Sequence, residues 1–465
     1  MHQLALCSNL MQSVHNHSIC SGIEKQGRHI TEGNSKVKAK LTSSSGSRRR
    51  FLKALLGASV LPGTFAGAAY AQPVEINFWD MIWGPREYAT VAQKLVDKFN
   101  ASLSGIKVVY RSVPWDSWYL TYVTAIASGS APDISTGGSF QAAQFYSMGE
   151  IYPVDKLIEE MKKDGSLSDF SEQALDTVRY DGHYVALPWG NDIRAFLYRK
   201  DILAAAGIAP PSTWDEFRAA AKKLTKNGVF GFVCSGDQNG FQMIVTAAVN
   251  NGGGLFDADR KPAITGDRTR EALQFVSSLV KDGSVNPASA GYSYDDSAAS
   301  FMRGESAFFV DNPNVTSSDT APKNKFGILP PLKGPHGNLG TFNGANNIMV
   351  YKQSKHPRET MKFLRWWSEN QLPLWTEGHA GNLPARASML KDAYFQNNPI
   401  LKYTVDNYIP IGKSLGAVAS GTSPQLNIVD GDGFLNSLTQ RILQGEDPAA
   451  PAQDAQIYLK GIMNK

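Results

Sequence analysis

Strand-like and helix-like hydrophobic patterns alternate along the chain from residue 74 onward. Residues 74–79 (VEINFW) alternate apolar and polar positions, which is typical of a strand with one buried face. Residues 87–100 instead place apolar side chains at a spacing of four, at Val91, Leu95 and Phe99, as on one face of a helix. This order of elements predicts an α/β architecture.

The same two patterns predict further elements along the chain. A helix should begin where Thr213 and Glu216 form a capping box, because Phe217, Ala221 and Leu224 then share one helical face. The other predicted strands cover 106–113 and a short buried stretch near Ile134, and the other predicted helices cover 117–128, 269–281, 357–368 and 433–443.

The residues before this pattern have the features of an export signal. The apolar run 54–71 is interrupted by glycines and a proline, whereas a membrane-spanning helix needs about 20 strongly apolar residues. The run follows a basic segment and ends in an A-x-A cleavage pattern at Ala69 and Ala71. We therefore predict that residues 1–71 comprise a disordered extension and a signal peptide. The residues that resemble the twin-arginine (Tat) export consensus are Arg48, Arg49, Phe51, Leu52 and Lys53.

The charge balance changes when residues 1–71, the leader, are excluded. The whole sequence carries 46 basic and 42 acidic residues, of which nine basic and two acidic residues precede Gln72. The remaining chain therefore has 37 basic against 40 acidic residues, and the main support for nucleic-acid binding disappears. Of the three cysteines only Cys234 follows the leader, so the exported part forms no intramolecular disulfide.

No catalytic motif in the sequence has the partners that its chemistry needs. GKSLG at 412–416 matches a nucleophile elbow, but no histidine follows Ser414 to complete a triad. The adjacent Asp295 and Asp296 favour a solvated helix start over an acid/base pair, whose carboxyl groups lie about 5 to 9 Å apart. Zinc-site spacings and a phosphate-binding loop are also missing from the sequence. We therefore expect no enzymatic activity, no bound metal and no cofactor.

Seven segments occur in an order typical of one family. They are IASGSAPDIS (126–135), GEIYPVDKLI (149–158), DGHYVALPWGNDIRAFLYRKDILAAAGIAPPSTWDEF (181–217), FMRGESAFFV (301–310), GILPPLKGPHG (327–337), SKHPRETMKFLRWW (354–367) and GNLPARASM (381–389). Through them the chain resembles the extracellular solute-binding proteins of family 1, the sugar receptors of ABC transporters typified by maltose-binding protein. The resemblance covers essentially all of the chain after residue 71.

The resemblance implies a two-lobed α/β fold of the type II periplasmic-binding-protein class, with a hinge that the chain crosses three times. It implies lobes formed by 72–190 with 334–380 (N-lobe) and by 191–333 with 381–465 (C-lobe). A sugar would bind in the cleft between them. Such a receptor is a monomer in the periplasm that delivers its ligand to inner-membrane ABC permease subunits. It would meet the Tat translocase during export and would bind no nucleic acid.

A sugar site needs hydrogen-bonding side chains for hydroxyl groups and flat apolar rings for C–H faces. Ligands of open α/β sheets bind beyond the carboxyl ends of the strands, where this sequence supplies both kinds of residue. Together with the resemblance, this predicts the following ligand-binding residues: Asp80, Met81, Trp83, Ser139, Phe140, Gln141, Trp189, Asn191, Asp192, Arg194, Phe241, Gln242, Asp311, Asn312, Asn314, Asn343, Asn346, Trp375, Arg386 and Asp432.

Several of these predictions have alternatives. The tryptophans suit either a stacking platform or the core, and Asp80 suits a helix cap. Asp311 and Asn312 suit an Asx turn before a proline. The amides and aromatic rings favour a neutral sugar, whereas Arg194 and Arg386 leave room for an acidic sugar or a sugar phosphate. Two other functions fit the same cleft: a periplasmic polysaccharide-cleaving enzyme, and a chemosensory or adhesion module without transport.

Overall fold

The computed structural model describes residues 72–465 with the exception of 103, 318–321, 323, 416–421 and 465. The predicted Tat motif and the cleavage residues lie outside the described residues. All structural statements below concern the described part of the chain.

An eight-stranded mixed sheet forms the first lobe. Its strand order is β13-β7-β12-β3-β1-β2, and β4 and β14 also pair with β12. β1 runs parallel to β2 and β3, whereas β12 runs antiparallel to β3 and β7. The strands are β1 (Val74–Met81), β2 (Ile106–Val113), β3 (Ile134–Gly137), β4 (Ile151–Tyr152), β7 (Leu187–Ile193), β12 (Thr341–Tyr351), β13 (Leu383–Pro384) and β14 (Gly412–Lys413).

A four-stranded sheet of order β11-β8-β10-β9 forms the second lobe. In it β10 is parallel to β9 and antiparallel to β8. Its strands are β8 (Ala195–Arg199), β9 (Phe230–Val233), β10 (Ser306–Asp311) and β11 (Phe326–Ile328), and a separate pair is made by β5 (Arg179–Tyr180) and β6 (His183–Tyr184).

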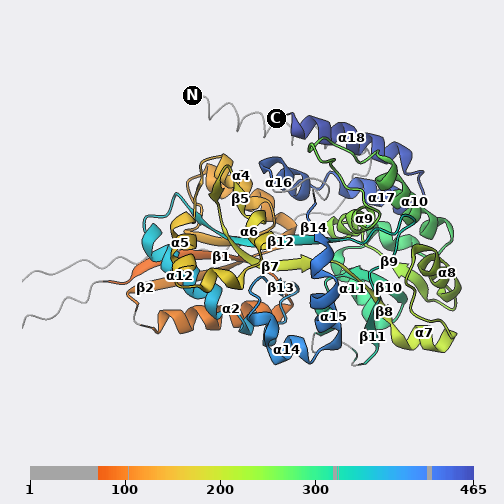
Figure 1. Ribbon diagram of the computed structural model, residues 1–465, viewed down its shortest axis with the longest axis horizontal. Coiled ribbons are helices and arrows are strands. Elements are labelled where there is room, and N and C mark those ends of the chain that lie inside the picture. Colours follow the sequence, from red (N-terminus) through yellow and green to blue (C-terminus); the bar gives the residue numbers. More distant parts are fainter. Residues whose placement is uncertain (1–71, 103, 318–321, 323, 416–421, 465) are drawn as a thin grey trace, which may run out of the picture. The chain divides into compact units, whose positions relative to one another are not determined.

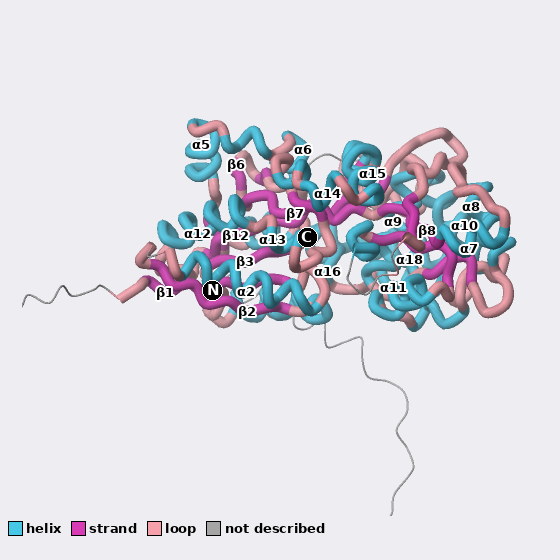
Figure 2. The backbone as a smooth tube through the Cα atoms, turned by 90° about the horizontal axis from the view of Figure 1, so that it is seen from below, coloured by secondary structure: helices cyan, strands magenta, loops and turns pink. Residues whose placement is uncertain are grey.

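Helices flank both sheets. Figure 1 shows α2, α5 and α12 beside the strands of the first sheet, and α7, α8 and α10 beside those of the second; the turned view in Figure 2 keeps this division. The first-lobe helices are α2 (Arg86–Asn100), α3 (Trp118–Ala127), α4 (Gln141–Ser147), α5 (Asp155–Lys163), α6 (Glu172–Thr177), α12 (Pro357–Asn370), α13 (Pro373–Thr376), α14 (Ala393–Gln396) and α15 (Pro399–Asn407). The second-lobe helices are α7 (Lys200–Ala206), α8 (Trp214–Leu224), α9 (Gln238–Asn250), α10 (Asp267–Lys281), α11 (Tyr294–Arg303), α16 (Pro424–Gly431), α17 (Asn436–Leu443) and α18 (Ala449–Met463).

Local capping explains two predicted helix starts. The Thr213 side chain accepts a hydrogen bond from the Glu216 backbone N–H at 3.2 Å and so caps α8. The Glu216 carboxylate bonds to the backbone N–H of Ser212 at 2.8 Å, one residue earlier than the expected box. At α11, Ser293 and Asp296 form a complete capping box, so the predicted solvated helix start is confirmed.

Two hydrophobic cores define the lobes. The first surrounds Phe78 and Phe145 of the large sheet region, and the second surrounds Phe217 and Phe308 of the smaller one. The chain passes from one lobe to the other between β7 and β8, before β12, and after β14. The predicted hinge with three crossings is therefore present.

The third crossing differs in position from the one we predicted. We assigned 381–465 to the second lobe, but Leu383, Phe395 and Leu401 are buried in the first core. β13 pairs with β7 of the large sheet, which holds this segment in the first lobe. Only from Leu415 onward do the buried apolar side chains join the second core.

Within the ranges that the structure describes, none of the helices is long and apolar enough to cross a membrane. The single described cysteine, Cys234, is free and buried in the second core. Burial raises the pKa of its thiol well above the ordinary value, so the reactive thiolate is strongly disfavoured.

Candidate ligand-binding site between the lobes

A buried arginine lies where the chain first crosses between the lobes. Arg194 follows β7 and is only 6% exposed. Its Nη1 and Nη2 donate to the two carboxylate oxygens of Asp192 at 2.5 and 3.1 Å. Nη2 also donates to Oε1 of Gln242 on α9, and Nη1 lies 3.9 Å from Asp311 Oδ1 at the end of β10. One guanidinium therefore contacts groups from both lobes.

Two amides extend this arrangement. Asn312 Nδ2 donates to Asp192 Oδ1 at 3.3 Å, which links the end of β10 to β7 across the lobes. Asn239 Nδ2 donates to Asp311 Oδ1 at 3.3 Å. We call the connected residues the interlobe polar cluster; they are Asp192, Arg194, Asn239, Gln242, Asp311 and Asn312.

Burial and neighbouring charges both shift the pKa values of the ionisable groups in this region. Burial raises the pKa of Asp311 to about 6, although the nearby Arg194 guanidinium pulls it down. Burial likewise raises the pKa of Asp430, on α16, to about 6, and the Asp192 carboxylate adds to the increase. Burial lowers the pKa of Arg194, but its attraction to Asp192 and Asp311 outweighs this, and the pKa is raised.

Side chains alternate between the two faces of the sheet along β7 and β12, and this determines which residues lie on the same face as Asp192. Asp192 is paired with Gly344, and Gly190 is paired with Asn346, so these four residues lie on one face. Asn191 and Asn343 point to the opposite face, where Asn343 Nδ2 donates to Asn191 Oδ1 at 3.2 Å. The structure therefore separates two predicted ligand-binding residues from Asp192.

The two glycines on the Asp192 face leave room for polar neighbours. A Cβ atom on Gly344 would lie 3.0 Å from Ser139 Oγ, and one on Gly190 would lie 2.6 Å from Asn382 Nδ2. Ser139 and Asn382 therefore approach this face closely. Only glycine at both positions permits that approach without displacing them.

Buried polar atoms without partners gather in this region. Burying such an atom costs about 1 to 3 kcal/mol, so a ligand that supplies a donor or an acceptor recovers that energy on binding. Among the described residues, those around β7 and β12 are Trp189 Nε1, Arg194 Nε, Asn343 Oδ1, Asn346 Nδ2, Asn347 Oδ1 and both side-chain polar atoms of Asn382.

A second set of contacts also joins the lobes. Asn427 Nδ2 on α16 donates to Gln144 Oε1 on α4 at 2.6 Å. At the end of α16, Gly431 lies against the Tyr119 ring of α3, since an added Cβ would come within 2.8 Å of it. Asn314 Nδ2 in turn donates to the backbone oxygens of Ala380 and Asn382. The lobes are thus in contact in this structure.

The three predicted tryptophans lie together in the first core. The Trp83 and Trp189 rings are 4.6 Å apart between centroids, and the Trp189 and Trp375 rings are 5.5 Å apart. Trp189 and Trp375 are fully buried. In this structure the three rings pack against one another.

Asp80 is enclosed by hydroxyl groups. Its Oδ2 accepts from Tyr88 at 2.9 Å and Tyr110 at 3.2 Å, and its Oδ1 accepts from Thr136 at 2.6 Å. Thr136 Oγ1 accepts in turn from Trp83 Nε1 at 3.0 Å. The Asp80 side chain is fully buried, so it holds β1, β2, β3 and α2 together and is not a helix cap.

Arg386 and Asp432 lie apart from the interlobe polar cluster. Arg386 Nη1 lies 3.1 Å from Asp169 Oδ2, and Arg386 Nε donates to Ser368 Oγ at 3.0 Å. Its guanidinium also covers the Phe170 ring at 4.7 Å. Asp432 is exposed at the end of α16, where it accepts from the Phe434 backbone N–H at 2.9 Å.

The remaining predicted residues serve the interior. Met81 belongs to the first core, and Phe140 and Phe241 belong to the second, although Phe140 precedes a first-lobe helix. Gln141 is fully buried, and its Oε1 accepts from the Gly138 backbone N–H at 3.2 Å. All four side chains are buried in this structure.

The predicted set of ligand-binding residues leaves out three residues near the site: Asn239, Asn382 and Asp430. Asn239 precedes Gln242 by three residues on α9, so helical spacing places both on one face and could have identified it. Asn382 lies in a turn before β13, and no local pattern marks it. Asp430 is separated from Asp432 by one residue, and only the observed end of α16 distinguishes their surroundings.

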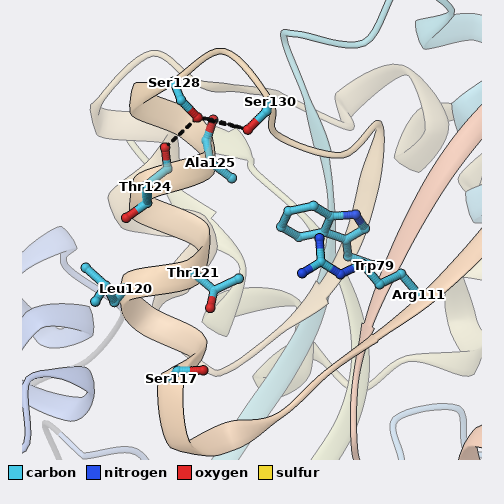
Figure 3. A pocket seen from close by; sticks show the side chains of 9 residues that line it. All are labelled: Trp79, Arg111, Ser117, Leu120, Thr121, Thr124, Ala125, Ser128 and Ser130. Atoms are coloured by element: carbon cyan, nitrogen blue, oxygen red, sulfur yellow. Dashed lines mark hydrogen bonds between the residues drawn. The ribbon is translucent and has the colours of Figure 1, made fainter. Parts of the chain in front are cut away.

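A hollow of about 380 Å³ lies elsewhere on the first lobe. Figure 3 shows hydroxyl side chains of α3, such as Thr121 and Thr124, on one side and Trp79 with Arg111 on the other. The Arg111 guanidinium stands 4.3 Å above the Trp79 ring and covers it. The ring is therefore already covered by this chain's own cation, and we place the candidate site at the interlobe polar cluster. In the described residues, no three His, Cys, Asp or Glu side chains are grouped to hold a metal ion.

Two α/β lobes, three crossings and a buried polar cluster between them define the class of two-lobed solute-binding proteins. Residues 84–371 match the family described as bacterial extracellular solute-binding protein, and the chain belongs to this family. The fold is the predicted type II periplasmic-binding-protein fold.

Solved structures and a curated relative agree with this assignment. A sugar transporter from Arthrobacter chlorophenolicus with bound laminaribiose is 31% identical, with a TM-score of 0.80 over 84% of this chain and 100% of that chain. A maltose-bound T. maritima protein is 23% identical, with a TM-score of 0.72 over 83% and 99%. A putative binding protein of Brucella abortus is 26% identical over 306 residues, 64% of this chain and 74% of that protein.

Proposed function

We propose that this protein is a periplasmic receptor that captures a sugar between its two lobes and delivers it to an inner-membrane ABC permease. The observation that carries the proposal is the interlobe polar cluster, where buried groups from β7, α9 and β10 meet. Its amides and carboxylates have the hydrogen-bonding capacity that sugar hydroxyls require. Support also comes from the relative that is 31% identical and holds laminaribiose.

Closure of the lobes is the way such a site retains its ligand. Asn312 reaches Asp192 across the lobes, and Asn427 of α16 reaches Gln144 of α4. A ligand that bonds to both lobes favours this arrangement over a separated one by the difference between its affinities for the two states. The closed lobes also present one continuous surface to the permease.

The proposal predicts thermal stabilisation by one class of sugar. The chain Gln72–Lys465, unfolded and refolded to remove carried-over ligand, is screened by thermal shift against neutral sugars, uronic acids, sugar phosphates, amino acids and polyamines. A ligand at about one hundred times its dissociation constant stabilises the native state by about 2.7 kcal/mol, which is a readily measured shift. Mass analysis of the recovered ligand provides the control.

A response to sugars, with the ligand recovered unchanged, supports a receptor. Cleaved products would instead favour the polysaccharide-cleaving alternative. A response confined to amino acids or polyamines would overturn the assignment to sugars while leaving the fold intact.

The twin-arginine motif predicts the export route. Arg48→Lys combined with Arg49→Lys should block periplasmic accumulation, because the translocase reads this pair and conserving its charge does not restore recognition. Arg50→Lys changes the neighbouring variable position and serves as the matched control, with normal export expected. The measurement is the amount of processed protein in the periplasm, and normal accumulation of the double variant would contradict this route.

A further inference from the structure

Both arginines that left room for an acidic sugar are occupied by this chain's own carboxylates. Arg194 is held by Asp192 through two hydrogen bonds, and Arg386 is held by Asp169. The Arg194 guanidinium, paired at both Nη atoms, cannot offer the same two-point contact to a uronate or a phosphate, and Arg386 lies apart from the interlobe polar cluster. The positive charge that would attract an anionic ligand is therefore neutralised within the protein.

Negative charge exceeds positive charge around the interlobe polar cluster. Asp192 and Asp311 flank Arg194 directly, and the Asp430 carboxyl group is near enough for both Asp192 and Arg194 to act on its pKa. Two carboxyl groups thus contact one guanidinium, and the nearby Asp430 has a buried Oδ1 without a hydrogen-bond partner. On the same face as Asp192, the buried Asn346 side chain has an unpartnered Nδ2, which points to a ligand with acceptor groups at this position.

We propose that this site selects its ligand by charge, so that it binds sugars carrying an ammonium group more tightly than neutral sugars and excludes uronates and sugar phosphates. The inference rests on the proposed sugar-receptor function and specifies the substrate class of that site.

The physical reason is the cost of burying charge without a partner. A ligand carboxylate or phosphate would enter a buried region that already holds excess negative charge, and it would find no free cation among the cluster residues. An ammonium group has three donors and no acceptor, which matches carboxylate oxygens. Hydroxyl groups of a neutral sugar bond to the same oxygens without the charge-assisted gain.

The titration of the cluster supports this selection and gives it a pH dependence. The groups facing Asp311 are Arg194, Asp192 and the Tyr294 hydroxyl, and those facing Asp430 are Asp192 and Arg194. The pKa values of Asp311 and Asp430 are both about 6, so both side chains are largely ionised at pH 7 and protonated at pH 5. The preference for an amino sugar should therefore be present at pH 7 and decline at pH 5.

The test compares matched sugars by isothermal titration at pH 7 and pH 5. The probes are glucose, glucosamine, glucuronate and glucose phosphate, the corresponding galactose series, and β-linked glucose and glucosamine disaccharides. We expect the amine to bind about tenfold more tightly than its neutral partner at pH 7, as a charge-assisted hydrogen bond implies. We expect the anionic members to bind at least about a hundredfold more weakly than the neutral ones.

A variant pair locates the effect. Asp430→Asn should reduce the preference for the amine, whereas Asp259→Asn, which removes a carboxylate that is 75% exposed on the same lobe, should leave it unchanged. If Asp430→Asn does not fold, the affinities of the matched sugars for the unmodified protein at pH 7 and pH 5 are sufficient to test charge selection.

The outcomes separate the two proposals. Equal affinity for amine and neutral sugar, or binding of a uronate or phosphate as tight as the neutral sugar, overturns charge selection and leaves the receptor function standing. The absence of binding by every sugar in the series overturns the receptor function itself. Binding of amino sugars alone supports charge selection and narrows the ligand class.

Discussion

Replacing Arg194 by leucine is expected to lower the free energy of unfolding by about 3 to 5 kcal/mol, because breaking a buried ion pair leaves its carboxylates without compensation. The side chain of Asp311 is only 2% exposed and that of Asp192 only 25%, so water provides little relief. The change also removes the donor to Gln242, and we expect the thermal response to sugar to disappear with it. Urea denaturation at pH 7 measures the loss.

Two comparisons make this expectation specific. Arg194→Lys keeps the charge but cannot form the two-point contact with Asp192, so its deficit should be smaller than that of leucine. Arg365→Leu removes an arginine that pairs with Asp164 at 2.6 Å on the surface, and it should cost much less, as exposed ion pairs generally do.

Acid should partly rescue Arg194→Leu. Without the guanidinium, the buried carboxyl group of Asp311, whose pKa burial already raises to about 6, is protonated more readily, so its uncompensated charge is removed as pH falls to 5. The difference in unfolding free energy between the variant and the unmodified protein should therefore shrink between pH 7 and pH 5. A deficit of the same size at both pH values, or a variant as stable as the unmodified protein, would show that Arg194 does not act through these charges.

The fold was predictable wherever a hydrophobic period extends over several turns or a whole strand. The strand at Ile106–Val113 has the predicted boundaries, and α2 begins one residue before its predicted start. The lobe boundary near residue 381 was not predictable in this way. Whether Phe395 and Leu401 join the first or the second core depends on the pairing of β13 with β7, which connects residues far apart in the sequence.

The candidate site was predictable as a region more than as a set of side chains. Strand ends and the hinge indicated Asp192, Arg194 and Asp311, and the structure brings these three residues together. The alternation of side chains along β7 could have shown that Asn191 points away from Asp192, since adjacent strand residues point to opposite faces of the sheet. The partner of Arg386 is Asp169, 217 residues earlier, and no local pattern encodes such a pairing.

The carboxyl group of Asp80 is expected to make the native state less stable as pH rises from about 4.5 to 7. Burial raises its pKa from the ordinary value of 3.8 to about 7, and the hydroxyl groups of Thr136, Tyr88 and Tyr110 only partly offset this. Between these two values the native state holds a proton that the unfolded chain has released, so stability falls as pH rises. Since one pKa unit corresponds to about 1.4 kcal/mol, the expected loss over this interval is about 3 kcal/mol.

Asp80→Asn isolates this contribution, because asparagine has nearly the same size, retains an acceptor oxygen for the surrounding hydroxyl groups, and does not titrate. Urea denaturation of both proteins at pH 4.5 and pH 7 measures how much the free energy of unfolding falls between these pH values. The fall should be smaller for the variant. Asp311 and Asp430 also have raised pKa values and titrate in the same direction, but they are present in both proteins and cancel in the comparison. Equal pH dependence in the two proteins would mean that Asp80 ionises without cost inside the first lobe. Its hydroxyl partners would then stabilise the carboxylate fully against burial.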